Sequence, residues 1–312
     1  MKILVTGAAG FIGSHLTEEL VVAGHEVVGL DGFIDGLYPN SQKRENWSRV
    51  VSKCGKLPLQ ELDLRKPIDP RVLDGVDVVY HLAAMPGLEL SWREIDLYVD
   101  CNIKGTMNLL VAAEHSKIKK FLHISTSSVY GKEITDEAQS ITNPISPYGI
   151  TKLAAESLVK TFCGSSGMDY SIFRLFSVYG PGQRSDMGFY IFIEKILKNQ
   201  TINIFGNGKQ SRANTFVADV SKILVLALEK ASNQQIYNIC GPQEANVLEV
   251  ISMISQLIGK DAKLEFNSER RGDQSKTTNV GARAGELLGF IPNTTLIKGL
   301  EQQIDWQSSR MR

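Results

Sequence analysis

The first residues of the chain constrain its fold more than any other segment. The apolar run Ile3–Val5 leads directly into the glycine-rich segment TGAAGFIG (residues 6–13), and an amphipathic stretch continues to Ala23. A strand, a glycine turn and a helix in this order let the backbone approach a phosphate group closely, with the helix N-terminus facing that phosphate. The segment therefore predicts the first crossover of a dinucleotide-binding sheet.

A carboxylate follows the glycine turn at the expected separation. A second strand-like run, Glu26–Leu30, ends in Asp31, and a ribose-binding acid is expected about 20 residues after the glycines. A carboxylate there accepts from a ribose 2′-hydroxyl and repels a 2′-phosphate, and no Arg follows closely. The sequence therefore favours NAD over NADP. The cofactor contacts expected from this segment are Gly7, Gly10, Phe11, Ile12, Gly13 and Asp31.

Strands and helices are expected to alternate up to about Leu175. The expected strands are Ile3–Val5, Glu26–Leu30, Leu57–Leu62, Asp77–His81, Lys120–Ser125 and Tyr170–Leu175. The expected helices are Phe11–Ala23, Ser91–His115 and Tyr148–Cys163. This alternation predicts an α/β fold with a doubly wound (Rossmann) parallel sheet.

The regular alternation of strands and helices ends after Gly182. There we expect helices at Phe189–Lys198 and Val220–Lys230, strands at Ile202–Phe205, Asn214–Val217 and Ile236–Asn238, and two more helices beyond Asn246. We therefore expect a cofactor-binding domain at residues 1–177, to which a strand within about 214–240 returns. Residues 178–312 are expected to form mainly a smaller C-terminal α/β lobe that binds the substrate.

Composition excludes several classes of function. Lys+Arg 34 balances Asp+Glu 34, so no overall charge favours nucleic acid or an anionic membrane as a partner. The four cysteines form no C-x-x-C pair, which suits a reducing compartment and predicts no metal site. No apolar run reaches the length of a secretion signal or a membrane span. We expect a cytoplasmic protein.

Tyr148 and Lys152 carry the expected chemistry. Four residues apart at the start of a predicted helix, they share one face, where the ammonium favours the charged form of the phenol. Beside a dinucleotide site, an activated phenol indicates hydride chemistry at an alcohol or ketone. A Y-x-x-x-K pair also occurs on ordinary exposed helices, so the assignment depends on the surrounding motifs.

Those motifs occur in a familiar order. They are TGAAGFIG, Asp63-Leu64, HLAA (81–84), Asn102, STSSVYG (125–131) and SPYGITK (146–152). With them, the chain resembles the extended short-chain dehydrogenase/reductase family, in particular its NAD-dependent nucleotide-sugar epimerases and dehydratases. The segment VYGPGQRSDM (178–187) is most similar to UDP-glucuronate 4-epimerases. The resemblance implies NAD as cofactor, a UDP-sugar as substrate, and a homodimer paired through the helix of Tyr148 and the helix near Ser91–His115.

The resemblance also implies roles for individual residues. Thr126, Tyr148 and Lys152 correspond to catalytic residues, and the last two also to cofactor contacts. Further cofactor contacts correspond to Asp63, Leu64, Leu82, Ala83, Ala84 and Asn102. For Asn102, an equally supported interpretation is a buried polar side chain whose hydrogen bonds are made within the protein. The substrate-binding positions correspond to Ser127, Ser128, Ser177, Arg184, Arg212, Arg270 and Asp273, with the last three toward the nucleotide diphosphate and its ribose.

Two neighbouring serines discriminate between reactions. Dehydratase relatives typically carry Asp-Glu where this chain has Ser127 and Ser128, so loss of water lacks its acid and base here. Hydroxyls also tolerate an anionic sugar carboxylate, although Ser128 could instead satisfy its own loop backbone. The expected reaction is the 4-epimerisation of UDP-glucuronate to UDP-galacturonate through a transient 4-keto sugar.

Other reactions remain open from the sequence. They are UDP-hexose or UDP-N-acetylhexosamine 4-epimerisation, UDP-glucuronate decarboxylation, and NAD sensing without catalysis. Two departures bear on the choice: Glu89 stands where glucuronate epimerases often carry Arg, and residues 212–216 read RANTF where relatives usually read RDFTY. An acid beside a diphosphate is unfavourable unless it turns to solvent.

Overall fold

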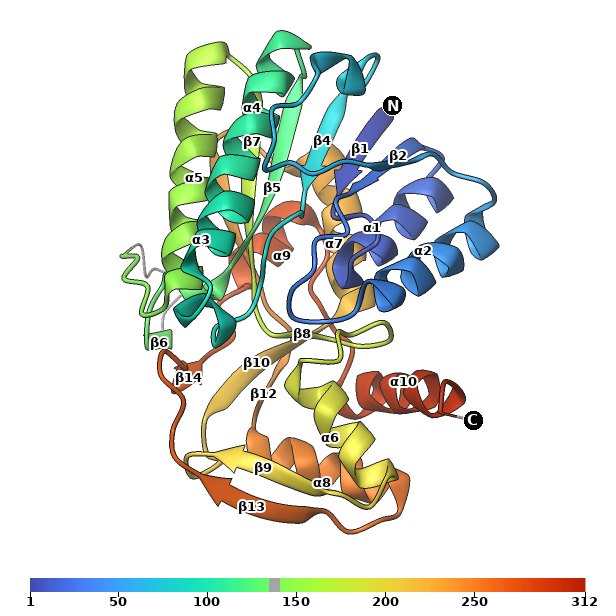
Figure 1. The fold of residues 1–312 in the computed structure, drawn as a ribbon, viewed down its shortest axis with the longest axis vertical. Helices are drawn as coiled ribbons and strands as arrows, with labels where there is room; N and C mark the ends of the chain where they lie inside the picture. Colours follow the sequence, from blue (N-terminus) through green and yellow to red (C-terminus); the bar gives the residue numbers. More distant parts are fainter. Residues whose placement is uncertain (135–140, 312) are drawn as a thin grey trace.

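A parallel sheet forms the centre of the larger part of the molecule (Figure 1). The structure is a computed structural model and describes residues 1–134 and 141–311. The strands are β1 (Lys2–Thr6), β2 (Glu26–Asp31), β3 (Leu59–Glu61), β4 (Val78–His81), β5 (Lys120–Thr126), β7 (Asp169–Leu175) and β11 (Gln235–Ile239). Their order is β11-β7-β5-β4-β1-β2-β3, and all neighbours run parallel. The predicted doubly wound α/β fold is confirmed.

Helices cover both faces of this sheet. The helices on one face are α1 (Phe11–Val22), α2 (Asn40–Cys54), α7 (Val217–Lys230) and α9 (Ala282–Leu288). The other face carries α4 (Gly105–His115) and α5 (Pro147–Ser166). The strands supply alternate residues to the two cores: Ile3 and Val5 belong to the first and Leu4 to the second.

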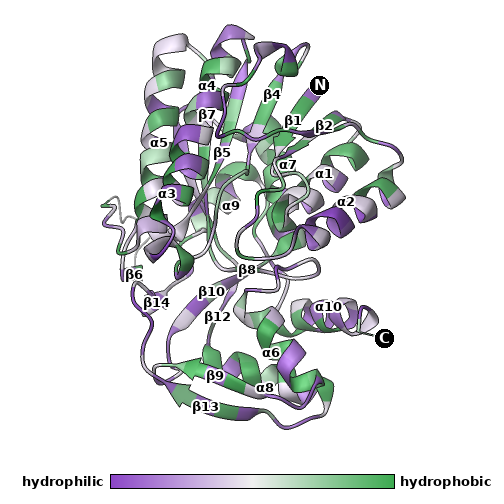
Figure 2. Ribbon diagram, viewed as in Figure 1, coloured by the Kyte–Doolittle hydropathy of each residue, from purple (hydrophilic) through white to green (hydrophobic). Residues whose placement is uncertain are grey.

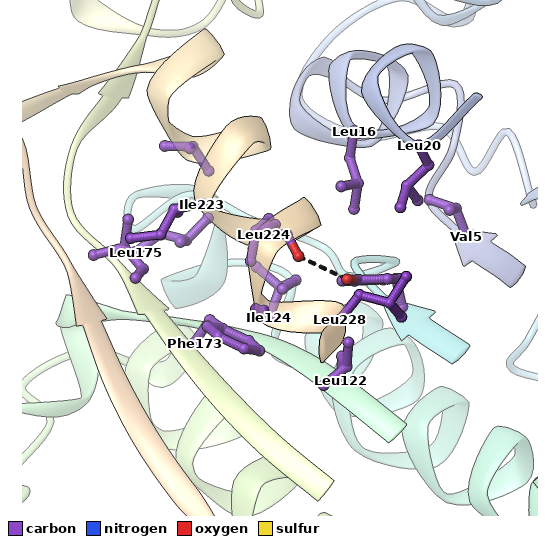
Figure 3. Packing of buried hydrophobic residues seen from close by; sticks show 14 of the residues in the cluster. Val5, Leu16, Leu20, Leu122, Ile124, Phe173, Leu175, Ile223, Leu224 and Leu228 are labelled. Atoms are coloured by element: carbon purple, nitrogen blue, oxygen red, sulfur yellow. Dashed lines mark hydrogen bonds between the residues drawn. The ribbon is translucent and has the colours of Figure 1, made fainter. Parts of the chain in front are cut away.

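The first core is built around α1 and α7. Figure 3 shows Leu16 from α1 and Leu224 from α7 above Ile124 and Phe173 of the sheet. Full burial of each such side chain contributes roughly 1.5–3 kcal/mol relative to leaving it exposed. The Tyr80 hydroxyl donates to the Leu224 carbonyl at 2.7 Å, so the polar group that β4 buries is satisfied within the core.

The helix expected over Ser91–His115 is not continuous. A 3₁₀ turn η2 (Leu90–Trp92) and the short α3 (Ile95–Tyr98) lead into a π-helical segment η3 (Val99–Lys104), and only then does α4 begin. Asn102 lies in the π-helical segment, where it is buried and bonded to the backbone of Met85. The wider turn accommodates that contact, which side-chain periodicity could not reveal.

Helix α2 was not expected from the sequence. Figure 2 shows it as largely hydrophilic, in contrast to the strands of the large sheet. Its buried apolar residues are Trp47 and Val50, and the Trp47 ring packs against Gly29 of β2. A helix attached by so few apolar side chains gives a weak periodic signal.

The smaller lobe has two further sheets. One has the order β12-β10-β14-β6, with β8 also paired to β10, and the other pairs β13 with β9. The strand bounds are β6 (Glu133–Ile134), β8 (Val178–Tyr179), β9 (Thr201–Phe205), β10 (Ser211–Phe216), β12 (Gln243–Asn246), β13 (Lys263–Asn267) and β14 (Lys276–Thr277). Helices α6 (Gly188–Leu197), α8 (Val247–Ile258) and α10 (Leu296–Ser309) share its apolar core. With α9, three helices follow Asn246 instead of the two expected.

Two single-turn segments complete the described secondary structure. They are η1 (Pro70–Leu73), before β4, and η4 (Ser127–Val129), directly after β5. The second of these turns carries the serine pair that the sequence singled out. It therefore lies at the carboxyl end of a central strand, where ligands of open α/β sheets bind.

Candidate active site

A pocket of about 410 Å³ lies at the carboxyl edge of the large sheet. It is lined by the loops after β1, β2, β4, β5 and β7, and by residues of the smaller lobe. Its volume is in the range of sites for small molecules and cofactors. The pocket brings together segments that are far apart in the sequence.

The glycine turn forms one wall of the pocket. Gly7 has φ +68° and packs against the backbone of Ala83, while a Cβ on Gly13 would overlap the carbonyl oxygen of Gly7. Helix α1 starts after Gly10 with no side-chain cap, so its first backbone N–H groups remain available to a ligand. This arrangement fits the pyrophosphate of a dinucleotide.

Asp31 lies at the next strand end. The backbone N–H groups of Ala9 and Phe33 donate to its carboxylate at 3.2 and 2.9 Å. Burial raises the pKa of Asp31, and the nearby Lys43 opposes that rise. Lys43 Nζ lies 3.9 Å from the carboxylate. The repulsion of a 2′-phosphate is therefore smaller than the sequence suggested, while the carboxylate can still accept from a ribose hydroxyl.

The loop after β2, residues 32–38, borders the pocket. Its Leu37 packs against Gly87, and its Gly36 faces the thioether of Met85. The two loops that meet here, residues 32–38 and 85–88, both line the pocket. A side chain at Gly36 or Gly87 would displace the flexible ends of Met85 or Leu37, and at Gly87 it would also be strained by the φ of +92°.

Tyr148 is positioned by the start of α5. Ser146 caps the helix by accepting from Gly149 N at 3.1 Å, and Pro147 occupies the first turn. Burial raises the pKa of Tyr148, whereas hydrogen bonding to Thr126, at the end of β5, and the positive charge of Arg184 lower it. The Thr126 hydroxyl donates to Ser128 Oγ at 3.2 Å.

Lys152 lies one turn further along α5. It is buried, and its Nζ donates to the carbonyl of Ile124 at 2.7 Å. Burial lowers the pKa of Lys152 to about 8, and the negative charge of Glu156 opposes this shift. The sequence identified the Tyr148–Lys152 pair but not the roles of Arg184 and Glu156 beside it.

The far side of the pocket carries hydroxyls and a guanidinium. Ser128 N donates to Thr126 Oγ1 at 3.1 Å, so this loop does satisfy some of its own backbone. Ser177 has φ 27°, a strained value for a residue with a side chain, and its carbonyl accepts from Thr215 N at 3.1 Å. Arg184 lines the pocket and makes two hydrogen bonds of 2.9 Å to Asp186.

The two arginines expected at the diphosphate are placed differently. Arg212 lines the pocket and donates to Asp273 Oδ1 at 2.7 Å. Arg270 does not border this pocket: its guanidinium stacks on Phe205 at 3.7 Å and lies 3.7 Å from Glu89. The Glu89 side chain is 59% exposed and outside the lining, so its charge turns to solvent.

Asn102 does not line the pocket either. Its Oδ1 accepts from Met85 N at 2.6 Å, and its Nδ2 donates to Met85 O and to Thr151 Oγ1, both at 3.0 Å. The structure supports the second interpretation of this residue, a satisfied buried polar group. Asn102 thereby connects the loop at residues 85–88 to the helix of Tyr148.

The remaining expected residues all border the pocket. They are Gly7, Gly10, Phe11, Ile12, Gly13, Asp31, Asp63, Leu64, Leu82, Ala83, Ala84, Thr126, Ser127, Ser128, Tyr148, Lys152, Ser177, Arg184, Arg212 and Asp273. Sequence reasoning missed other polar lining residues, namely Tyr38, Lys43, Arg65, Ser125 and Gln274. Lys43 lies on the unexpected α2, and Gln274 follows a loop whose position depends on the lobe. Only Arg65, two residues after Asp63, and Ser125, directly before Thr126, offered a local signal.

The described residues contain no cluster of three or more His, Cys, Asp or Glu side chains able to hold a metal ion. Within the same part of the chain, every helix is too short or too polar to cross a membrane.

Comparison with known proteins places this geometry in a family. The chain is 40% identical to an uncharacterized UDP-glucose epimerase, YtcB, of Bacillus subtilis (strain 168), over 99% of this chain and 98% of that protein. It is 32% identical to a UDP-glucuronate 4-epimerase of Thermodesulfobacterium geofontis, over 99% and 96%.

A solved structure agrees closely with the fold. The UDP-glucuronic acid 4-epimerase from Bacillus cereus, in complex with UDP-glucuronic acid and NAD, superposes with a TM-score of 0.95 at 39% identity, covering 99% of this chain and 100% of that chain. The family model described as "NAD dependent epimerase/dehydratase family" matches residues 3–240. The chain with this glycine turn, strand-end carboxylate and Thr–Tyr–Lys group therefore belongs to the NAD dependent epimerase/dehydratase family.

Proposed function

We propose that the protein inverts C4 of a UDP-sugar, and that the sugar is glucuronate. UDP-glucuronate would be converted to UDP-galacturonate through a transient 4-keto sugar. The observation that carries the proposal is the meeting of Thr126, Tyr148 and Lys152 with Ser127 and Arg184 in the pocket that also contains the glycine turn. Residues 1–177 would form most of the cofactor-binding domain, with the lobe supplying the substrate contacts.

The residues around the glycine turn fit NAD. The uncapped start of α1 would hold the pyrophosphate, and Asp31 would accept from the adenosine ribose. When bound, NAD supplies the site that accepts the hydride from C4 and returns it. The sugar must present its other face before the hydride returns, because inversion requires delivery from the opposite side.

The protein's own groups manage the proton. Tyr148 would take the proton of the C4 hydroxyl as that carbon is oxidised and give it back on reduction. Thr126, bonded to Tyr148, would hold the sugar oxygen, and the buried ammonium of Lys152 would stabilise the phenolate. Ser127 and Ser128 cannot replace the acid and base that a dehydration needs.

The charge of the pocket supports an anionic sugar. Its basic lining residues are Lys43, Arg65, Lys152, Arg184 and Arg212, whereas its acidic ones are Asp31, Asp63 and Asp273. Each of the three acids lies within 4 Å of a basic side chain. Arg184, although paired with Asp186, acts electrostatically on Tyr148, so a guanidinium stands near the proposed reacting end of the pocket. A uronate carboxylate would be attracted there.

UDP-glucose is the second candidate substrate. The relative with 40% identity is named a UDP-glucose epimerase, while the solved relative is named for UDP-glucuronic acid. A non-catalytic NAD sensor is disfavoured by the joint presence of Thr126, Tyr148 and Lys152 in one pocket.

Incubation of the purified protein with UDP-glucuronate should produce UDP-galacturonate. Proton NMR of the sugar signals measures this conversion. Parallel incubations with UDP-glucose and UDP-N-acetylglucosamine serve as the comparison, because these substrates lack the carboxylate. Unchanged UDP-glucuronate together with converted UDP-glucose would assign the second candidate. Release of CO₂ with a UDP-pentose would instead show decarboxylation.

Replacement of Tyr148 by Phe should lower turnover by at least about 100-fold, because the phenol is the proposed proton carrier. Binding of NAD, measured by titration calorimetry, should persist, since the glycine turn is untouched. Tyr190→Phe removes the hydroxyl of a tyrosine on α6 outside the pocket lining, and serves as the control. Turnover by the Tyr148→Phe protein near the native rate would exclude the phenol from the chemistry.

Arg212 and Arg270 offer a matched pair for the diphosphate. Arg212→Met should raise KM for the UDP-sugar about tenfold or more, because it removes a charge-assisted hydrogen bond to phosphate. Arg270→Met, outside the lining, should change KM by less than about threefold. Steady-state kinetics of the two variants decide; equal effects would contradict the placement of the diphosphate beside Arg212.

We also propose that the protein forms a homodimer through α3, η3, α4 and α5. Large apolar side chains of these elements are exposed: Ile95, Val99, Met107, Val111 and Ile150. Figure 1 shows α3, α4 and α5 side by side at one flank of the sheet. Light scattering should give twice the chain mass of 34.4 kDa, and Met107→Glu should shift it toward one chain. A native mass of one chain would refute the dimer.

A further inference from the structure

We propose that Glu156 and Arg174 form a buried charged pair that positions Lys152 and the end of β5 for the proposed epimerisation, on which this inference rests. Neither residue lines the pocket, and neither was singled out by the sequence motifs. They are positioning residues that would act through the groups that touch the substrate.

One carboxylate holds two strands and a helix together. Glu156, on α5, is fully buried, and its Oε1 accepts from Ser125 Oγ at 2.6 Å and from Arg174 Nε at 2.9 Å. Its Oε2 accepts from the second guanidinium nitrogen of Arg174 at 2.7 Å. Ser125 of β5 and Arg174 of β7 are direct partners in the sheet, so both side chains reach α5 from adjacent strands.

The same carboxylate lies next to the reactive groups. Ser125 immediately precedes Thr126, and Glu156 follows Lys152 by one helical turn on the same face of α5. The hydrogen bonds of Glu156 therefore fix the end of β5 relative to the helix that carries Tyr148 and Lys152. A shift of Glu156 would move both halves of the Thr126–Tyr148 contact.

Glu156 is also the counter-charge of two buried cations. Its negative charge raises the pKa of Lys152 against the lowering by burial. The other titratable groups packed there are His81 on β4, His123 on β5 and Tyr130 after η4, whose ring stacks on the Arg174 guanidinium. Burial lowers the pKa of His81 to about 3 and that of His123 well below its usual value. Both imidazoles are neutral at physiological pH, so Glu156 alone among these groups balances Lys152 and Arg174.

The pair contributes little to stability in the simplest case. Taking two charges out of water costs about as much as their attraction returns, so replacing both by neutral side chains of similar shape is often tolerated, whereas removing one partner leaves a buried unpaired charge and is destabilising. A purely structural role predicts that loss of either partner damages the protein in the same way. A role in setting the charge of Lys152 predicts opposite effects from the two partners.

The experiment compares Glu156→Gln, Arg174→Met and the double variant. Lysine enriched in ¹³C at Cε allows the titration of Lys152 to be followed by NMR, with the signal assigned through Lys152→Arg. Glu156→Gln should lower the pH midpoint of Lys152 by about one unit or more, since two buried cations remain unbalanced. Arg174→Met should raise it, because Glu156 then faces Lys152 alone. The double variant should lie between the two.

Activity gives the second measurement. Because Lys152 must be protonated to stabilise the phenolate, the rate should fall as pH rises through about 8. That alkaline limb should move to lower pH in Glu156→Gln and to higher pH in Arg174→Met. Thermal unfolding establishes that each variant is folded. If Glu156→Gln does not fold, Arg174→Met and the double variant decide through the difference between their Lys152 midpoints.

The outcomes separate this inference from the proposed function. Opposite shifts of the Lys152 midpoint support the charged pair even if no nucleotide sugar is converted, in which case the proposed function alone fails. Shifts in the same direction, or unchanged midpoints in folded variants, overturn the inference while leaving UDP-glucuronate conversion by the native protein unaffected.

Discussion

The parallel arrangement of the large sheet is the constraint on which the site depends. Because all neighbouring strands point the same way, the residues that follow β1, β2, β5 and β7 meet at one edge. The glycine turn, Asp31, Thr126 and Ser177 are separated by tens of residues and yet border one pocket. Helix α5 then needs only to start beside β5 for Tyr148 to join them. The chemistry follows from the direction of the strands.

Burial gives neighbouring charges their influence at this site. Out of water, Tyr148 resists ionisation and Lys152 releases its proton more readily, so each depends on the groups around it. Arg184 reaches Tyr148 from the loop after β8, and Glu156 reaches Lys152 from within α5. One charge within the pocket lining, Arg184, and one outside it, Glu156, therefore influence the reactive pair. The protein controls its proton carrier from outside the pocket lining as well as within it.

Local patterns in the sequence carried most of the fold and the reactive centre. The glycine turn, the β-branched strands and the Ser146-Pro147 helix start are encoded within a few residues, so their positions could be predicted. Two elements could not be predicted in this way. The polar helix α2 buries few apolar residues, and the π-helical segment at Asn102 depends on a hydrogen bond to a residue distant in the sequence. Arg212 and Arg270 were both assigned to the diphosphate from the sequence, although one lies in β10 and the other in the loop between β13 and β14. Only the packing of the lobe distinguishes the one that faces the pocket.

The loops at residues 32–38 and 85–88 touch through Leu37 and Gly87, and both line the pocket proposed to hold the dinucleotide. A dinucleotide that stayed bound there through the proposed turnover would act as a prosthetic group and not as a co-substrate. The proposed reaction oxidises and then reduces the same carbon, which consumes no net electrons. Such a protein would interconvert its sugars at a rate insensitive to the balance of oxidised and reduced nicotinamide in its surroundings.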